Sequence, residues 1–286
     1  MTTPTVPSLL LEHVNFTYPN GLRAIDDVSF SLTGGTVCAL VGVNGSGKST
    51  LFNAIMGILR PQAGRILING LPVASALKQN AIAYVPQSEQ IDWHFPIRVR
   101  DVVLLGRYGH MNFLRHARAQ DYAKVDGALA RLGIADLADR QIGALSGGQK
   151  KRVFLARALA QESRVILLDE PFTGVDISTE QAVMALLQEL RDQGYLMLVS
   201  THNLGAVPQF CNEVVLLRHR IIAVGDMVTT YTRDNLERAF GGRLKNIYLG
   251  DEQMPELTLV SDDEHPAVFY GDSKHSPAHG AGENMP

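Results

Sequence analysis

The sequence predicts an α/β fold in which buried strands alternate with helices. Three short runs of apolar, largely β-branched residues have the length of strands, at 36–41, 165–168 and 196–199. A glycine-rich loop and a helical pattern follow the first run, and polar side chains follow the other two. A doubly wound sheet places its ligands beyond the ends of such strands. We therefore expect the functional residues to gather where these runs end.

The first strand leads into the sequence GVNGSGKST at residues 42–50. Three glycines allow a tight loop whose backbone N–H groups point inward and form an anion-binding nest. A helix is expected over residues 49–59, with the positive end of its dipole facing the bound phosphates. We call residues 42–50 the phosphate loop. Its expected nucleotide-binding residues are Gly42, Val43, Asn44, Gly45, Ser46, Gly47, Lys48, Ser49 and Thr50.

Two side chains of the phosphate loop have expected chemical roles. Lys48 is expected to reach the β- and γ-phosphates as a point charge, and the hydroxyl of Ser49 is expected to ligate Mg²⁺. A chance match to this pattern occurs in about one chain in a hundred of this length. The strand before the loop and the helix after it make chance rarer still, so the loop predicts a nucleotide site.

The second strand ends in two carboxylates. Asp169 is placed to hold the Mg²⁺, as in other enzymes with a phosphate loop. Glu170 is one residue further on, so its side chain leaves the strand on the other face. The metal does not need a second carboxylate, which suits a general base that orients the attacking water. The alternative, an ordinary polar turn, is improbable beside a phosphate loop.

The sequence LSGGQ at residues 145–149 opens a helical pattern over 149–161. A serine and two glycines at the start of a helix form another anion site. One nucleotide does not need two such sites from one chain. We therefore expect this LSGGQ segment to serve a nucleotide held by another subunit.

Together these motifs resemble the ATP-binding cassette (ABC) ATPases, in which LSGGQ is the family signature. The resemblance covers about residues 8–245. It implies an α/β P-loop NTPase cassette with a RecA-like sheet lobe and an inserted helical lobe at about 88–160. It also implies ATP and Mg²⁺ as ligands and a homodimer of cassettes, in which Ser146, Gly147, Gly148 and Gln149 cover the nucleotide of the other copy.

The resemblance assigns further roles to single residues. Tyr18 corresponds to the aromatic residue that stacks on adenine, although a tyrosine packed in the core is the alternative. Gln87 corresponds to the glutamine that touches Mg²⁺ and the attacking water and relays the nucleotide state to the partner. Asp176 resembles the aspartate at the dimer seam, and His202 the histidine that contacts the γ-phosphate. Lys150 and Lys151, after the LSGGQ segment, resemble mild variants of little consequence.

The strings DWHFPIRVRDVV and GRYGHM resemble those of ATPase subunits from bacterial importers for manganese, iron and zinc. The likeness is greatest to manganese/iron importers. This implies polytopic membrane permease subunits as partners and, indirectly, a periplasmic or surface metal-binding protein. An importer for zinc or another small solute remains an alternative. A soluble ABC protein of DNA repair or translation fits less well, since those carry a long coiled coil or two cassettes.

A cluster of large apolar residues follows Gln87 and suggests a socket for a helix of the membrane partner. Interior packing of the helical lobe is the alternative for each of them. The cluster comprises Ile91, Trp93, Phe95, Pro96 and Ile97.

The resemblance to importer ATPases implies a position at the cytoplasmic face of the inner membrane, as a peripheral subunit, and the composition is compatible with it. The formal charge of the 286 residues is −3, which gives no sign of a nucleic-acid partner. No window approaches 18 consecutive apolar residues, and the N-terminus lacks a signal-peptide pattern. The two isolated cysteines, Cys38 and Cys211, are typical of a reducing compartment.

Residues 250–286 differ from the rest. Eight acidic residues and one lysine give this tail a charge of −7, and its last stretch is rich in Gly, Pro and polar residues. The composition predicts an acidic, disordered tail. His265, His275 and His279 could bind a transition metal loosely, but a solvated tail with incidental histidines is favoured.

Overall fold

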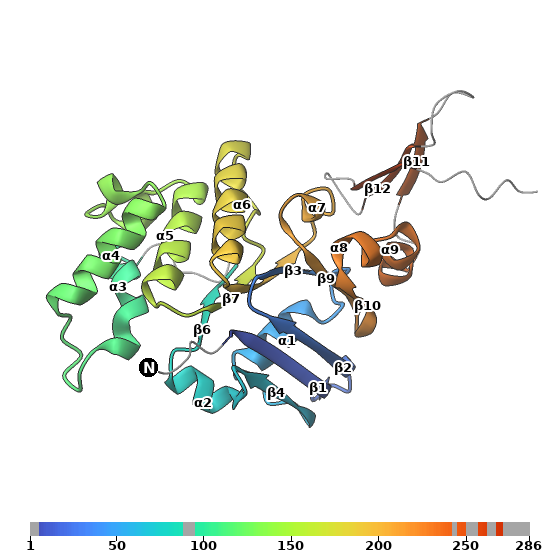
Figure 1. The fold of residues 1–286 in the computed structure, drawn as a ribbon, viewed down its shortest axis with the longest axis horizontal. Coiled ribbons are helices and arrows are strands. Elements are labelled where there is room, and N and C mark those ends of the chain that lie inside the picture. The colour runs from blue at the N-terminus through green and yellow to red at the C-terminus, as the bar shows by residue number, and fades with distance from the viewer. Residues whose placement is uncertain (1–5, 88–94, 242–244, 250–256, 262–266, 271–286) are drawn as a thin grey trace, which may run out of the picture.

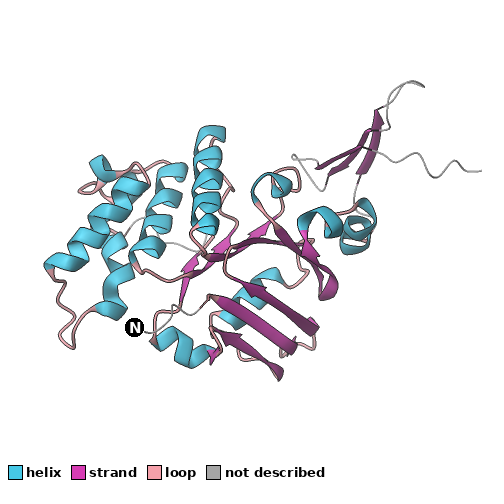
Figure 2. Ribbon diagram, in the orientation of Figure 1, coloured by secondary structure: helices cyan, strands magenta, loops and turns pink. Residues whose placement is uncertain are grey.

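The computed structural model describes residues 6–87, 95–241, 245–249, 257–261 and 267–270. A six-stranded sheet forms its centre (Figures 1 and 2). The strands of this sheet are β3 (Thr36–Val41), β6 (Ile82–Val85), β7 (Val165–Asp169), β8 (Leu196–Thr201), β9 (Glu213–Arg218) and β10 (Arg220–Asp226). Their order is β10-β9-β3-β8-β7-β6, and all neighbours are parallel except β10 and β9. The predicted α/β class is therefore confirmed.

The central sheet separates two hydrophobic cores. All six residues of β3 are buried, because successive side chains point to opposite faces and both faces are covered. Val37, Ala39 and Val41 pack into one core, and Cys38 and Leu40 into the other. The continuous apolar runs in the sequence follow from this double burial.

Helices cover the first core. They include α3 (Val99–Leu104), α4 (Ala119–Arg131), α5 (Gly147–Ala160) and α6 (Ile177–Asp192), and α3 to α5 form a lobe at one end of the molecule (Figure 1). The lobe also contains the short 3₁₀ segments η2 (Leu105–His110), η3 (Ala135–Leu137) and η4 (Ile142–Ala144). The buried Arg107 joins these elements, since its Nε donates to Asp121 Oδ1 at 3.1 Å and its Nη1 donates to Ala160 O at 2.8 Å.

Helix α1 (Lys48–Ile55) and an antiparallel sheet cover the second core. The strands of that sheet, in the order β2-β1-β4-β5, are β2 (Arg23–Thr33), β1 (Ser8–Thr17), β4 (Ala63–Ile68) and β5 (Leu71–Pro72), and α2 (Val73–Lys78) follows β5. The helix expected over 49–59 ends earlier, at Ile55. Gly57 explains the early end, because its φ of 69° places it in the left-handed conformation that commonly stops a helix.

Three short helices and a third sheet follow β8. The helices are α7 (Val207–Phe210), α8 (Met227–Thr230) and α9 (Arg233–Phe240). The antiparallel sheet consists of β11 (Lys245–Leu249), β12 (Leu257–Ser261) and β13 (Ala267–Tyr270). Strands β12 and β13 lie within 250–286, the tail for which the composition predicts disorder. The apolar run LTLVS can pair with β11, and its strand pattern was hidden by the composition of the whole tail.

The three tail histidines, His265, His275 and His279, lie outside the described residues. Within the described ranges, no helix has both the length and the apolar character that crossing a bilayer requires.

Candidate functional site

The phosphate loop joins β3 to α1, at the carboxyl end of a central strand. Gly45 and Gly47 adopt φ values of 82° and 105°, which glycine reaches without strain. A Cβ at Gly47 would lie 2.5 Å from the carbonyl oxygen of Ala24, so only glycine fits there. Gly47 also caps α1 with no side chain bonded to the first amides of the helix. That helix start presents N–H groups and a positive dipole end to an anion.

Two buried polar groups of the phosphate loop fit a phosphate ligand. Lys48 is 8% exposed, and its Nζ donates to the carbonyl oxygens of Gly42 at 2.6 Å and Val43 at 3.2 Å. These bonds keep the ammonium group folded over the loop. The hydroxyl of Ser46 is 1% exposed and has no hydrogen-bond partner among the described residues. An orphaned hydroxyl is costly unless a ligand meets it.

A cavity of about 250 Å³ collects most of the predicted nucleotide-site residues. Its walls bring together segments that are far apart in the sequence: the antiparallel sheet, the phosphate loop, the end of β6 and the end of β7. The predicted site residues on its walls are Tyr18, Asn44, Gly45, Gly47, Lys48, Ser49, Thr50, Gln87, Asp169 and Glu170. Gly42, Val43 and Ser46 are buried or half-buried in the turn behind these walls.

The cavity contains a donor set that fits Mg²⁺. Ser49, Gln87 and Asp169 each offer a side-chain oxygen to the cavity, and oxygen atoms are the ligands that Mg²⁺ prefers. The carboxylate of Asp169 is held from two neighbouring strands. Ser200 Oγ donates to its Oδ1 at 2.5 Å, and the hydroxyl of Tyr84 donates to its Oδ2 at 3.2 Å. Such outer partners fix the orientation of a metal-binding carboxylate.

Tyr84 remains a hydrogen-bond donor over the physiological pH range. Burial raises the pKa of Tyr84 well above its ordinary value, and the negative charge of Asp169 raises it further. The phenol therefore keeps its proton, and the bond to the carboxylate persists.

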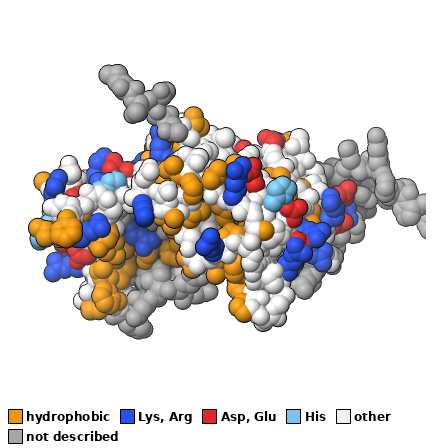
Figure 3. All heavy atoms as spheres, turned by 90° about the horizontal axis from the view of Figure 1, so that it is seen from below, with side chains coloured by type: hydrophobic (Ala, Val, Ile, Leu, Met, Phe, Trp, Pro, Cys, Tyr) orange, Lys and Arg blue, Asp and Glu red, His pale blue; other side chains and the backbone are white. Residues whose placement is uncertain are grey.

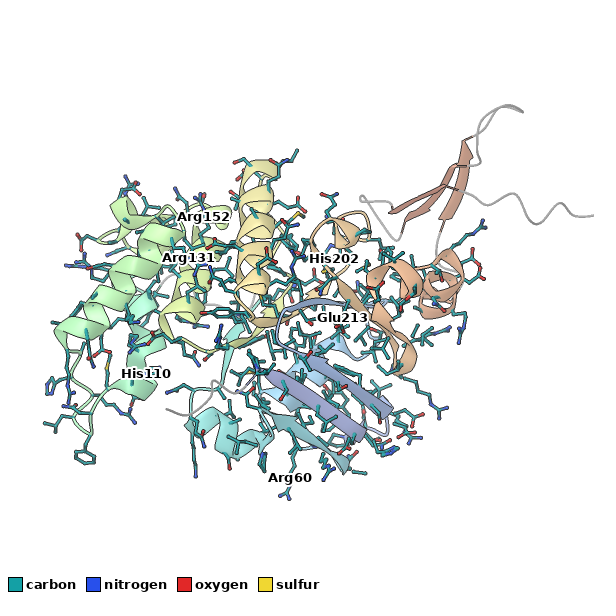
Figure 4. The ribbon with its side chains drawn as sticks, in the orientation of Figure 1. Arg60, His110, Arg131, Arg152, His202 and Glu213 are labelled. Atoms are coloured by element: carbon teal, nitrogen blue, oxygen red, sulfur yellow. The ribbon has the colours of Figure 1, made fainter. Side chains whose placement is uncertain are left out.

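The backbone and side chain of Glu170 are both constrained. Its φ is 50°, a left-handed conformation that non-glycine residues adopt at an energetic cost. Its Oε2 lies 2.7 Å from His202 Nδ1 and accepts a hydrogen bond from Thr173 Oγ1 at 3.3 Å. Glu170 and His202 both line a second cavity of about 460 Å³, next to the first. His202 lies well away from the tip of the helical lobe, where His110 is found (Figure 4).

The LSGGQ segment has a different geometry. Ser146 caps α5 and forms a reciprocal pair with Gln149: Gln149 N donates to Ser146 Oγ at 3.3 Å, and Ser146 N donates to Gln149 Oε1 at 3.0 Å. Ser146 and Gly147 are exposed and Gly148 is buried. Among the described residues that line the 250 Å³ cavity, none belongs to the LSGGQ segment.

Asp176 lies close to the LSGGQ segment. It caps α6, and its carboxylate accepts hydrogen bonds from Thr179 N at 2.9 Å and Thr179 Oγ1 at 2.8 Å. These bonds lower the pKa of Asp176 to about 2. A Cβ at Gly148 would lie 2.9 Å from the same Thr179 hydroxyl, and one at Gly147 would lie 3.0 Å from Gly174 O. The two glycines therefore let α5 approach the start of α6.

The position of Tyr18 has features of both a ring that stacks on adenine and a tyrosine that packs in the core. Its ring is half-buried and meets Phe16 edge to face, with 5.0 Å between ring centroids. Its hydroxyl lies 3.1 Å from Thr50 Oγ1, and the residue lines the 250 Å³ cavity. The ring is thus anchored to the core on one side while it faces the phosphate loop.

Sequence reasoning missed several residues that hold the site. Tyr84 lies three positions before Gln87, and Ser200 lies two positions before His202, close to residues whose roles the resemblance assigns. Thr179 follows Asp176 by three positions, the spacing of a helix cap, which was a usable signal. Lys151, read as a mild variant, is 5% exposed and its Nζ donates to Glu170 O at 2.7 Å.

Comparison with known proteins agrees with this geometry. The family model described as ABC transporter matches residues 25–173. The chain is 57% identical to the chelated iron transport system membrane protein YfeB of Yersinia pestis, over 95% of this chain and 94% of that protein. It is 53% identical to the manganese transport system ATP-binding protein MntA of Synechocystis sp., over 81% of this chain and 89% of that protein.

A solved structure has the same fold. An inward-facing metal-chelate type ABC transporter matches with a TM-score of 0.75 and 29% identity, over 92% of this chain and 98% of that chain. The family match covers more than half of the chain, and the relatives match along most of their length. The chain therefore belongs to the ABC transporter family, as one of its ATP-binding cassettes.

Proposed function

We propose that this chain is the ATP-hydrolysing subunit of a bacterial importer for manganese or iron, peripheral to the cytoplasmic face of the inner membrane. The observation that carries the proposal is the 250 Å³ cavity, where Lys48, Asp169 and Glu170 meet while the LSGGQ segment lies elsewhere. The metal is suggested by the names of the iron and manganese relatives.

In the proposed function, the nucleotide phosphates bind to positive groups that the fold holds in place: the Lys48 ammonium group and the start of α1. Lys48 and the open start of α1 offer positive charge and N–H donors to the β- and γ-phosphates. The half-buried ring of Tyr18 offers a face for stacking on adenine. Ser49, Gln87 and Asp169 would hold Mg²⁺, which when bound neutralises phosphate charge.

Hydrolysis needs a base that accepts a proton from the attacking water. Glu170 takes this role, because its carboxylate lies at the boundary of the two cavities and is oriented by His202 and Thr173. His202 is the residue that contacts the γ-phosphate. Since these groups are held before the reaction, catalysis relies chiefly on positioning and charge stabilisation.

Two copies of the chain complete each site. In the proposed homodimer the exposed Ser146 and Gly147, with Gly148 and Gln149, cover the nucleotide bound to the phosphate loop of the other copy. Asp176 lies at the seam, since it is exposed and adjoins the LSGGQ segment through Thr179. Closure and opening of this dimer drive the membrane subunits.

The helical lobe is the proposed docking site for the permease. Phe95 and Pro96 are exposed, whereas Ile97 packs against the first core, so the predicted apolar cluster divides between surface and interior. Ile91 and Trp93 lie outside the described residues. The lobe carries further exposed apolar side chains: Leu105, Tyr108, Phe113 and Leu114. Hydrophobic side chains also gather at one end of the face that Figure 3 shows.

A docking role for the helical lobe predicts that Phe95→Ala leaves ATP hydrolysis by the purified subunit unchanged but weakens its retention on permease-containing membranes. Val228→Ala is the matched control, because Val228 is 85% exposed but lies far along the chain, in α8. Equal retention of both variants would contradict docking at Phe95.

Metal uptake tests the proposed function as a whole. Cells that carry Glu170→Gln in place of the native chain are expected to take up Mn²⁺ or Fe²⁺ no faster than cells that lack it. Loss of Zn²⁺ uptake alone would point instead to a zinc importer, the alternative reading. Unchanged uptake of all three ions would overturn the assignment to metal import. A periplasmic or surface metal-binding protein is the expected indirect partner.

A further inference from the structure

Lys151 is a buried cation next to the proposed base. It lies in the second turn of α5, five positions after Ser146, and only 5% of it is exposed. Its Nζ donates to the backbone carbonyl oxygen of Glu170 at 2.7 Å. A cation near the start of a helix is disfavoured by the helix dipole, and burial adds a desolvation cost. The bond to Glu170 O offsets part of both.

The residue that receives this bond has a strained backbone. Glu170 has a φ of 50° although it has a Cβ. Its N–H group donates to Ser200 O and Ser200 Oγ, both at 3.2 Å, and its carbonyl oxygen also accepts from Thr173 N at 3.3 Å. Strained conformations persist when their surroundings hold them from several sides. Lys151 supplies the charged contact on the carbonyl side.

The backbone of Glu170 determines where its carboxylate points. With this backbone, Oε2 lies 2.7 Å from His202 Nδ1. Relaxation of φ towards negative values would rotate the side chain away from that position. The same helix that carries Lys151 begins at the LSGGQ segment, whose exposed end faces the second copy in the proposed dimer.

We propose that Lys151 is a positioning residue for ATP hydrolysis: its ammonium group holds the backbone of Glu170 in the left-handed conformation that places the base. It thereby links the start of the LSGGQ helix to the base in the same chain. This inference rests on the proposed function, in which Glu170 accepts the proton.

The test is steady-state ATP hydrolysis by the full chain carrying Lys151→Met, which keeps much of the length and loses the donor. We expect kcat to fall about tenfold or more with the ATP KM unchanged, because a displaced base affects the chemical step and not ground-state binding. Lys151→Arg restores a charged donor and is expected to recover most of the rate. Lys150→Met removes the same charge from the adjacent position and is expected to retain the native kcat.

A combination with Glu170→Gln shows whether Lys151 acts through the base. If it does, Lys151→Met lowers the residual single-turnover rate of that variant by no more than about twofold, since coupled residues are not additive. If the Met variant does not fold, as judged by its thermal unfolding, Lys151→Gln takes its place in both experiments.

A native kcat in the Lys151 variants, or an equal loss in Lys150→Met, would overturn the inference. So would a full additional loss in the Glu170→Gln background. The proposed function fails separately, if Glu170→Gln alone hydrolyses ATP at the native rate.

Discussion

The phosphate loop and the LSGGQ segment are both small-residue helix starts, yet the structure completes only one of them within the chain. The phosphate loop lies at a cavity wall, opposite Asp169 and Glu170. The LSGGQ segment has its serine exposed and contributes no described residue to that cavity. The N-terminal caps of the two helices also differ.

Gly47 leaves the first amides of α1 without a side-chain acceptor, whereas Ser146 and Gln149 already cap α5 reciprocally. The phosphate loop is therefore prepared for a strongly charged ligand. In the proposed homodimer, the LSGGQ segment is a preformed surface that would meet a ligand bound to the other copy. Two similar helix-start motifs can therefore differ in whether the same chain supplies the rest of the site.

The largest effect is expected from a variant that blocks hydrolysis while both helix starts stay intact. Glu170→Gln is expected to lower hydrolysis about 10²- to 10⁴-fold, the range of a lost general base, and to keep ATP affinity. Glu180→Gln removes the same charge from the 460 Å³ cavity and is expected to cost far less. Phosphate release and equilibrium ATP binding are the measurements. Comparable loss in both variants would remove Glu170 from its role.

Lys48→Ala removes the charged side chain of the phosphate loop. Loss of a buried, charge-assisted contact is expected to weaken ATP binding roughly 10- to 100-fold, because hydrogen bonds to charged groups contribute about 1.5–3 kcal/mol. Binding of a fluorescent ATP analogue to the monomer measures it. Lys78→Ala, at the exposed end of α2, is the charge-matched control. An unchanged affinity in Lys48→Ala would show that the loop is not used as proposed.

Gly148→Ala disturbs the packing of the LSGGQ segment against α6. Its Cβ would lie 2.9 Å from Thr179 Oγ1, so overpacking is expected to lower the free energy of unfolding by about 1–3 kcal/mol. In α4, Gly127 has no atom within 4 Å of such a Cβ, and Gly127→Ala is expected to raise stability by about 0.5–1 kcal/mol. Urea unfolding measures both. Equal stability of the two variants would contradict close packing of α5 on α6.

The smallest effect is expected from removing residues 251–286. No predicted site residue lies there, so ATP affinity and hydrolysis are expected to stay within about twofold of the full chain. The strands β12 and β13 are lost with the segment, and thermal unfolding shows whether they stabilise the cassette. A truncated chain that cannot fold would show that this segment is an integral part of it.

Much of the fold and most of the cavity wall could be predicted because their signals are local. The phosphate loop, Asp169 and Glu170 are short motifs attached to apolar strands, and each strand places its own end residues. The predicted range of helix α1 extends four residues beyond its observed end at Ile55, because the pattern of helix-forming residues does not show that Gly57 stops the helix. The strand pattern of β12 was lost in the average composition of the tail.

The residues that hold the site could not be predicted in the same way, because their roles depend on strand order. Ser200 reaches Asp169 only because β7 and β8 are neighbours, with these two residues paired in register. Tyr84 reaches the same carboxylate from the other neighbour, β6. Lys151 meets Glu170 because α5 packs over that edge of the sheet. None of these pairings is encoded in local spacing.

If the LSGGQ segment completes a site on a second copy, the molar mass of the protein in Mg-ATP must reveal a dimer. The measurement is light scattering of the peak eluted from a size-exclusion column. The Glu170→Gln variant is expected to have twice the molar mass of the monomer. Adding Ser146→Arg is expected to leave a monomer whose ATP affinity is unchanged. A double variant that still dimerises with ATP, or a monomer that loses ATP binding, would contradict the account.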